Sequence, residues 1–434
     1  MRRFLLVVVI LLLIGTGVYL YMNRIDRAEG TSPAIAGAPP SAEVLARGEY
    51  LTKAADCAAC HTVPGSNKAF AGGVPFRLPF GTIYSSNITA DEADGIGNWT
   101  DEDFLHAVRD GIGKHGEHLY PAFPYTSYTQ LSRSDVLAIK AYLFNQPKVS
   151  QPNRPNDLSF PYNQRWTIGF WNAAFFKNQR FQPDTSQSPQ WNSGKYLATA
   201  LGHCAECHTP RNRLFALQHN EELSGEELQG WHAYNITSDK VHGIGAWSDA
   251  ELASYLVTGH ADGRGSASGP MAEAVENSLR FLQPGDTAAL ITYLRSVPAR
   301  EGKQPVTVDP KPAAALASSD YAPAGDAHAD AMGAKLFEGA CASCHQWNGK
   351  GQQTPYASLL GTRGVNDVRG TNLTQILLHG SSLRGEHANV FMPGFGDAYS
   401  DTEIAALSNY VIGHFGNKQG TVTPDDVAER RKQL

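Results

Sequence analysis

The chain has little cysteine and no surplus of positive charge. Its 434 residues include only six cysteines, and 36 lysines and arginines are outnumbered by 42 aspartates and glutamates, which leaves a formal net charge of −6. Because nucleic-acid binding neutralises phosphates with a basic surface, we expect no nucleic-acid partner. All six cysteines lie in three Cys-x-x-Cys-His motifs. None is left over for a structural disulfide.

The three motifs carry the strongest chemical signal in the chain. They consist of Cys57, Cys60 and His61; Cys204, Cys207 and His208; and Cys341, Cys344 and His345. In a c-type haem site the two thiols form thioether bonds to the haem edge, and the adjacent histidine supplies an axial nitrogen to iron. We therefore predict three covalently bound haems c. A zinc site would need four convergent ligands, and a thioredoxin-like site would need a strand and helix setting that the sequence does not indicate.

Only one stretch is apolar enough to suggest a membrane segment. Residues 4–21 follow Arg2 and Arg3, and their length is at the short end of what crosses a bilayer. Bulky residues, including Tyr21 and Met22, stand where a cleaved signal would need small ones, which favours a retained anchor over a signal sequence. We expect the rest of the chain on the periplasmic side of a bacterial inner membrane.

Two parts of the chain repeat one another at an offset of 148 residues. The segments 87–89 and 95–99 recur at this offset as 235–237 and 243–247, and residues 48–51 have their counterpart at 194–197. Apolar stripes and capping residues predict helices in both repeats and around the third motif, and little alternates as a strand would. The sequence thus predicts a mainly α fold, with three class I cytochrome c domains in tandem behind one N-terminal transmembrane helix.

Composition divides the chain into eight parts. We expect a cytoplasmic tip and anchor at 1–27, a tether at 28–41, the first domain at 42–150, an aromatic connector at 151–190, the second domain at 191–298, a Pro- and Ala-rich linker at 299–329, the third domain at 330–416 and a polar tail at 417–434. The connector is too aromatic for a solvated linker. It is predicted to pack between the first two domains, with contact to a partner or the membrane as the alternative. The tail is expected to be a solvated end.

Methionine is scarce, which narrows the choice of a sixth iron ligand. Of the five methionines, Met271 and Met392 each lie on a loop between a haem motif and the last helix of its domain. Such a loop can cover the far face of a haem, so we predict that these two sulfurs are axial ligands. The alternative is that each methionine fills a gap in a core.

The first domain breaks this pattern. Phe123 stands 148 residues before Met271, and phenylalanine cannot coordinate iron. Either a histidine closes the first haem, with His118 as the candidate ahead of His106 and His115, or a ligand comes from elsewhere, or the iron stays open. Loss of a methionine ligand is expected to lower the reduction potential of this haem.

With these residues the chain resembles the three-haem cytochrome c subunits of bacterial membrane-bound dehydrogenases that oxidise alcohols, aldehydes or gluconate. The likeness covers nearly all of residues 42–416 and includes the segments 81–89 and 202–210 and Met392-Pro393. Many relatives carry methionine where Phe123 stands, so their ligation of the first haem does not transfer. In this respect the chain is more similar to cytochromes that serve molybdenum hydroxylases of aldehydes or N-heterocycles.

The resemblance implies an electron relay. A catalytic dehydrogenase would oxidise the substrate, and this subunit would pass electrons through its haems to ubiquinone or a terminal oxidase without substrate catalysis of its own. Two other functions fit part of the sequence. One is a haem peroxidase or ligand sensor that uses an open first iron, and the other is a standalone membrane-tethered electron shuttle. An adjacent dehydrogenase gene would favour the relay.

Overall fold

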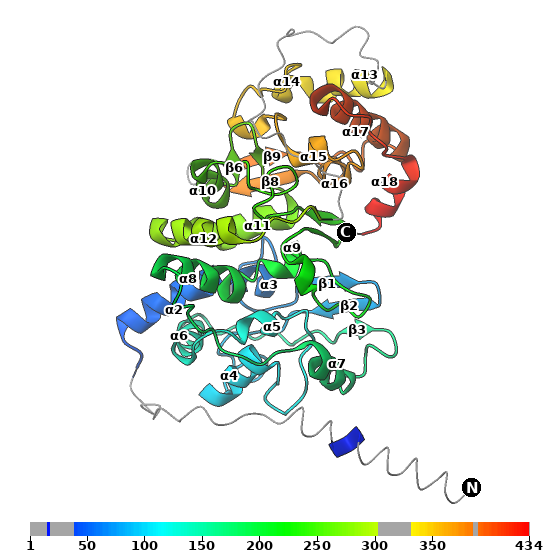
Figure 1. Cartoon of the computed structure of the whole chain (residues 1–434). Coiled ribbons are helices and arrows are strands. Elements are labelled where there is room, and N and C mark those ends of the chain that lie inside the picture. The colour runs from blue at the N-terminus through cyan, green and yellow to red at the C-terminus, as the bar shows by residue number, and fades with distance from the viewer. Residues whose placement is uncertain (1–14, 18–38, 303–330, 385–388, 434) are drawn as a thin grey trace, which may run out of the picture. The chain divides into compact units, whose positions relative to one another are not determined.

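A computed structural model describes residues 15–17, 39–302, 331–384 and 389–433. The chain divides into two compact units, Met1–Gln182 and Pro183–Leu434. The first unit holds the first repeat and most of the aromatic connector, and the second unit holds the second and third repeats (Figure 1). The predicted anchor at 4–21 and most of the linker at 299–329 lie outside the described residues. Within the described residues, no helix is both long and apolar enough to cross a membrane.

Helices dominate both units, which confirms the prediction of a mainly α fold. The first unit contains α2 (Ala42–Ala54), α3 (Cys57–His61), α4 (Asp101–Asp110), α5 (Tyr125–Tyr128), α6 (Arg133–Phe144) and α7 (Thr167–Phe175). The second repeat contains α8 (Pro189–Tyr196), η1 (Leu197–Leu201), α9 (Ala205–His208), η2 (His219–Glu221), α10 (Asp249–Thr258), α11 (Gly269–Asn277), η3 (Leu279–Phe281) and α12 (Pro284–Ser296). The third contains α13 (Ala331–Ala340), α14 (Ala342–His345), η4 (Pro355–Ala357), α15 (Arg363–Asn366), α16 (Thr371–His379), α17 (Asp401–Gly416) and α18 (Pro424–Arg431).

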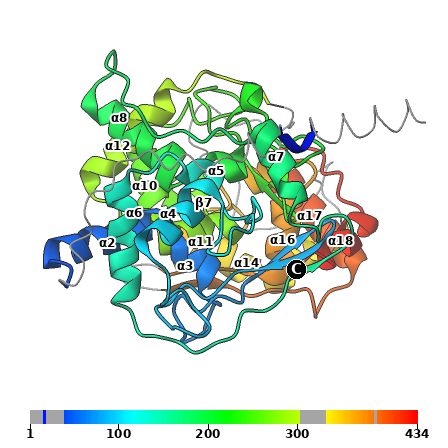
Figure 2. The same cartoon turned by 90° about the horizontal axis from the view of Figure 1, so that it is seen from below.

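Each repeat is built on a crossing between an early helix and a late one. These pairs are α2 with α6, α8 with α12, and α13 with α17, and the first pair is visible in Figure 2. A glycine lies at every crossing because a side chain would meet the facing backbone. A Cβ placed there would lie within 2.0 Å of a carbonyl oxygen at Gly48, 1.9 Å at Gly194 and 2.3 Å at Gly333. The third repeat thus shares the architecture of the other two, although its sequence does not follow the offset of 148 residues.

The strands are short and lie beside the helices. In the first unit, β1 (Pro75–Leu78), β2 (Gly81–Tyr84) and β3 (Asp157–Leu158) form an antiparallel sheet in that order. In the second unit, three antiparallel pairs are formed by β4 (Glu226–Leu228) with β5 (Trp231–Ala233), β6 (His260–Ala261) with β7 (Gly265–Ser266), and β8 (Ser381–Arg384) with β9 (Asn389–Met392). Because β3 belongs to the predicted connector, this segment completes the sheet of the first repeat.

The aromatic connector packs on the first repeat through one face and exposes the other. The Tyr125 hydroxyl donates a 2.6 Å hydrogen bond to the buried Asn172 of α7, and the Tyr125 ring meets the edge of Phe176. On the outer side, Trp166 and Phe170 form an edge-to-face pair and are 59% and 53% exposed. These outer rings form a patch that the first repeat does not cover.

The expectation that residues 417–434 form a solvated end is wrong. This segment contains α18, which packs against α16 and α17 (Figure 1). Val422 and Val427 are buried, and the Arg431 guanidinium binds Asp401 at 2.9 Å. Only two valines in a polar run carry the apolar contact, which is too weak a stripe to predict a packed helix.

The second and third repeats are joined by a polar interface inside the second unit. The backbone N–H of His232 donates to Asn372 Oδ1 at 2.7 Å, and Asn372 Nδ2 donates back to the His232 carbonyl at 2.9 Å. Asp367 is fully buried beside them, with its carboxylate 3.5 Å from His232 Nδ1 and 3.5 Å from Arg369 Nε. The two hydrogen bonds between His232 and Asn372 fix how the second and third repeats meet at this point.

Candidate haem sites

Each Cys-x-x-Cys-His motif forms a short helix directly after the first helix of its repeat. The motif helices are α3, α9 and α14. Burial raises the pKa of Cys57 and of Cys204 to about 12, so both thiols are neutral at physiological pH. A redox-active Cys-x-x-Cys site needs the opposite, a thiol whose pKa is lowered. The thioredoxin-like alternative is therefore not supported.

The three motif histidines share one hydrogen-bond arrangement. Nδ1 lies 2.7 Å from the Ser86 carbonyl oxygen in His61, 2.6 Å from that of Tyr234 in His208 and 2.6 Å from that of Ala357 in His345. Because a carbonyl can only accept, Nδ1 must carry the hydrogen. The lone pair of Nε2 is then free for a metal.

The protonation state of these histidines suits ligation. Burial lowers the pKa of His61 and of His345, and it is the largest cause that lowers the pKa of His208 to about 4. All three imidazoles are therefore neutral near pH 7. A neutral ring held by a carbonyl at Nδ1 is the usual form of a histidine ligand to iron.

The loops that supply these carbonyls explain why the sequence repeats where it does. Ser86 and Tyr234 each precede an asparagine of the repeated Asn-Ile-Thr segment. The side-chain oxygen of Asn87 accepts from the Thr89 N–H at 2.9 Å, and that of Asn235 accepts from the Thr237 N–H at 2.8 Å. This turn fixes the preceding carbonyl toward the histidine. The sequence showed the repeat but not the role of the residue before it.

Two buried hydrogen-bond donors in the second repeat show whether its residues suit a haem. Tyr234 Oη and Trp247 Nε1 are buried and have no hydrogen-bond partner among the described residues. Their rings lie 5.5 and 5.9 Å from the guanidinium carbon of Arg363. A buried donor without an acceptor costs about 1–3 kcal/mol. The propionate oxygens of a haem held by His208 are acceptors of the kind these donors lack, so the residues fit the group.

The two predicted methionine ligands lie between the motif and the last helix of their repeats, but in a helix and a strand rather than on the expected loops. Met271 lies in the first turn of α11. It packs against a buried cluster that consists of Ala267, Ala272, Val275 and Leu383. Met392 ends β9 and packs against the core of the third repeat. Each side chain is half-buried. Their ligation of iron stays a prediction.

The first repeat keeps the strand pairing that precedes Met271 in the second repeat. Ile112 pairs with His118 as His260 pairs with Ser266, at the same offset of 148 residues. The residues that follow His118 and Ser266 also make matching hydrogen bonds. The Leu119 N–H donates to the Gly111 carbonyl at 2.7 Å, and the Ala267 N–H donates to the Gly259 carbonyl at 2.7 Å. The strand pairing before the ligand position is thus shared, but Met271 lies within α11, whereas Phe123 lies in the turn before α5.

The candidate histidines of the first repeat have different surroundings. His106 Nδ1 is 2.7 Å from Asp110 Oδ2, and His115 is exposed on a turn. Burial lowers the pKa of His118, whose carbonyl accepts a 3.0 Å hydrogen bond from Arg165. His118 therefore remains the candidate among the three.

Metal sites of other kinds find no support. Among the described residues, no group of three or more His, Cys, Asp or Glu side chains could hold a metal ion. The zinc alternative would need such a cluster. Cysteine pairs each followed by a neutral, carbonyl-held histidine define c-type haem sites.

Comparison with known proteins gives the same class. The cytochrome c family matches residues 45–146 and 331–413. The chain is 40% identical to the fructose dehydrogenase cytochrome subunit of Gluconobacter japonicus, over 97% of this chain and 87% of that protein. It is 38% identical to the gluconate 2-dehydrogenase cytochrome c subunit of Pantoea cypripedii, over 90% of each. It is also 40% identical to a nicotinate dehydrogenase subunit of Pseudomonas putida, over 86% of this chain and 30% of that protein.

The chain belongs to the family of cytochrome c subunits of bacterial dehydrogenases. Its sites bind haem c covalently, and its role is electron transfer. This confirms the family that the motifs and repeats indicated.

Proposed function

We propose that this chain carries three covalently bound haems c and relays electrons from a catalytic dehydrogenase to ubiquinone or a terminal oxidase. The observation that carries the proposal is the shared geometry of His61, His208 and His345, each with Nδ1 held by a backbone carbonyl. When bound, haem c supplies a one-electron couple at each site. The cysteines of each motif would hold the group, and the backbone carbonyl at Nδ1 would keep the motif histidine oriented toward it.

The number of haems is tested by covalent haem content. Full-length protein is denatured in alkaline pyridine, and its haem is quantified against protein mass by absorbance and mass spectrometry. Three haems per chain are expected, and replacing both cysteines of one motif, as in Cys341→Ala with Cys344→Ala, should remove one third. A wild-type content of two would contradict the proposal.

We further propose that the electron donor is a dehydrogenase encoded beside this chain. The family relationship supports a donor of this type, since the relatives are named as subunits of dehydrogenases for fructose, gluconate and nicotinate. Phe123 favours the molybdenum-hydroxylase branch of the family. The test adds fructose, gluconate, an alcohol, an aldehyde or nicotinate to native membranes and records haem reduction by absorbance. If none of these substrates reduces haem in membranes that a chemical reductant reduces fully, the standalone shuttle is favoured.

We also propose that the chain is anchored in the inner membrane by residues 4–21, with its haem sites on the periplasmic side. Covalent haem attachment and the apolar run behind two arginines support this placement. Mass spectrometry of the purified N-terminus and protease treatment of spheroplasts test it. Cleavage after the apolar run, or protection of the haem-bearing part in intact spheroplasts, would overturn it.

A peroxidase or ligand-sensing role is the second candidate. A specific observation favours it, because Phe123 takes the place of a methionine ligand in the first repeat. Peroxide turnover by the reduced full-length protein tests this role. Turnover no faster than that of a Phe123→Met variant would exclude it.

A further inference from the structure

One short segment of the third repeat contacts the supports of two motif histidines. Residues 356–363 form this segment. Near its start the Ala357 carbonyl holds His345, and at its end the Arg363 side chain binds the loop of the second repeat that holds His208. The segment lies against the second repeat along its length. A Cβ on Gly361 would lie 1.8 Å from the carbonyl oxygen of Gly263, and one on Gly265 would lie 2.6 Å from Thr362.

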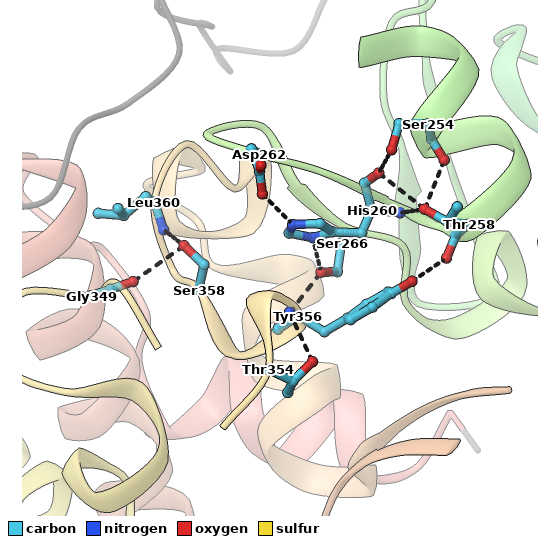
Figure 3. Close-up of polar contacts among 10 residues, drawn as sticks. All are labelled: Ser254, Thr258, His260, Asp262, Ser266, Gly349, Thr354, Tyr356, Ser358 and Leu360. Carbon is cyan, nitrogen blue, oxygen red and sulfur yellow. Dashed lines mark hydrogen bonds and ion pairs between the residues drawn. The ribbon is translucent and has the colours of Figure 1, made fainter. Parts of the chain in front are cut away.

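The first end of this segment is the ring of Tyr356. Its hydroxyl donates to the Thr258 carbonyl at 3.0 Å, and its ring lies 4.9 Å from that of His260 (Figure 3). His260 is itself held by Ser266, whose hydroxyl lies 3.4 Å from the Tyr356 carbonyl. The next residue, Ala357, accepts the hydrogen bond of His345. The support of the third motif histidine is thus fixed against the second repeat.

The second end of the segment is Arg363. One terminal nitrogen donates to the Asn235 carbonyl at 2.8 Å, and the other donates to the Gly243 carbonyl at 2.7 Å. Asn235 follows Tyr234, whose carbonyl holds His208. The guanidinium therefore joins two points of the connection between β5 and α10, which begins with the residue that holds His208, although it comes from the third repeat.

Arg363 also acts on this site as a charge. Burial lowers the pKa of its guanidinium to about 10, which still leaves it charged at physiological pH. Its charge is among the causes that lower the pKa of His208, after burial. No carboxylate pairs with it among the described residues, and its terminal nitrogens donate to the two neutral carbonyls. Among the described residues, the positive charge therefore has no carboxylate partner.

We propose that Arg363 is a positioning residue for the second haem site, supplied by the third repeat, and that it raises the reduction potential of the haem bound at His208. The inference rests on the proposed function only in requiring haem at that site. Reduction adds a negative charge to the site, and a buried cation close by favours the reduced state. The bonds to Asn235 and Gly243 keep the Tyr234 carbonyl in line with His208, which maintains the orientation of the ligand.

The test is a potentiometric titration of full-length protein, followed by optical and electron paramagnetic resonance spectra. The haem whose spectrum changes in Met271→Ala is assigned as the second. In Arg363→Gln the reduction equilibrium constant of this haem should fall about tenfold, which is about 59 mV for a one-electron couple. The other two haems should keep their potentials. Arg369→Gln is the matched control, since it removes a cation from the same interface near Asp367 and Glu227.

The conservative variant separates charge from position. Arg363→Lys keeps the charge but cannot bind both carbonyls in the same geometry. The reduction potential of the second haem should return most of the way to the wild-type value in this variant. The electron paramagnetic resonance signals of that haem should still differ from those of the wild type. If Arg363→Gln does not fold, Arg363→Lys carries the test through those signals. Selective loss of the second haem in Arg363→Gln would also support the proposal.

Three results would overturn the inference. The first is an unchanged second haem in both variants, and the second is an equal shift of all haems. The third is a shift in Arg369→Gln as large as that in Arg363→Gln. None of these bears on the dehydrogenase partner, because the titration uses only this chain. Absence of haem at the second motif in the wild type would instead overturn the proposed function.

Discussion

Phe123 and Met271 occupy equivalent positions in two repeats that share the same local hydrogen bonds. In each, a short antiparallel pairing precedes the position by five residues, at His118 and at Ser266. The pairing that leads to the ligand position is therefore kept in the first repeat, although Met271 lies within α11 and Phe123 in the turn before α5.

A methionine at position 123 should occupy the open coordination position of the first haem iron. In Phe123→Met a thioether replaces a ring of similar volume, so the fold should be kept. We expect carbon monoxide to bind one third of the haem in the reduced wild type and none in the variant, measured by difference absorbance. The potential of the first haem should rise, since methionine ligation raises it. Phe176→Met, which adds a methionine to the same unit at another place, should bind carbon monoxide like the wild type. A wild type that binds none would favour His118 as the ligand.

The exposed rings of the connector should matter for electron delivery and not for the haems. Trp166→Ala combined with Phe170→Ala removes apolar surface that the first repeat does not cover. Aromatic rings of this kind favour membrane interfaces and partner surfaces. We expect slower quinone reduction in native membranes and unchanged haem spectra. Phe281→Ala, at a ring that is 44% exposed in the second repeat, is the control. Equal rates in both variants would exclude a role for the patch.

The glycine at the third helix crossing should tolerate no side chain. In Gly333→Ala the new methyl would meet the Ala406 carbonyl, and overpacking of this kind costs about 1–3 kcal/mol. Gly339→Ala is the matched control in the same helix, because nothing lies within 4 Å of its Cβ position. We expect a lower melting temperature for the first variant and an equal or higher one for the second, followed by haem absorbance. Equal melting temperatures of the two variants would show that the helix crossing can accommodate a methyl group at position 333.

The interface of the second and third repeats should weaken in acid. Burial acts to raise the pKa of Asp367, but the hydrogen bond from His232 and the charge of Arg369 outweigh it, and the pKa lies below the ordinary 3.8. A lowered pKa gives stability that is present above about pH 4 and is lost as the pH falls through the pKa of the folded state. Asp367→Asn should therefore melt at a lower temperature than the wild type near pH 7. The difference should shrink at about pH 3.

A surface control checks that prediction. Asp262 has a side chain that is 96% exposed, so Asp262→Asn should melt like the wild type at both pH values. A constant difference between Asp367→Asn and the wild type across this range would mean that the carboxylate charge is not what stabilises the interface.

The sequence predicted those parts of the sites that are local in the chain. Each haem motif places its two cysteines and its histidine within five residues, and the repeat has a constant offset. Both features can be recognised in the sequence without knowledge of the fold. The carbonyl that holds His208 lies 26 residues away, and the contact of Arg363 with Asn235 spans 128 residues. Such partners are selected by packing, which no periodic pattern encodes. The tail failed for a related reason, because Val422 and Val427 are too few to mark a buried face.

The helix crossings also constrain how the protein is made. Every haem motif follows soon after the first helix of its crossing, while the helix that closes the crossing is made about 60 to 90 residues later. This separation delays closure in a chain synthesised from its N-terminus. Each motif is therefore presented on an unfinished, accessible chain for an interval before its pocket closes. The attachment machinery can reach the cysteines in that interval. A cofactor that arrives after α6, α12 or α17 has docked would have to enter a repeat whose helices are already packed.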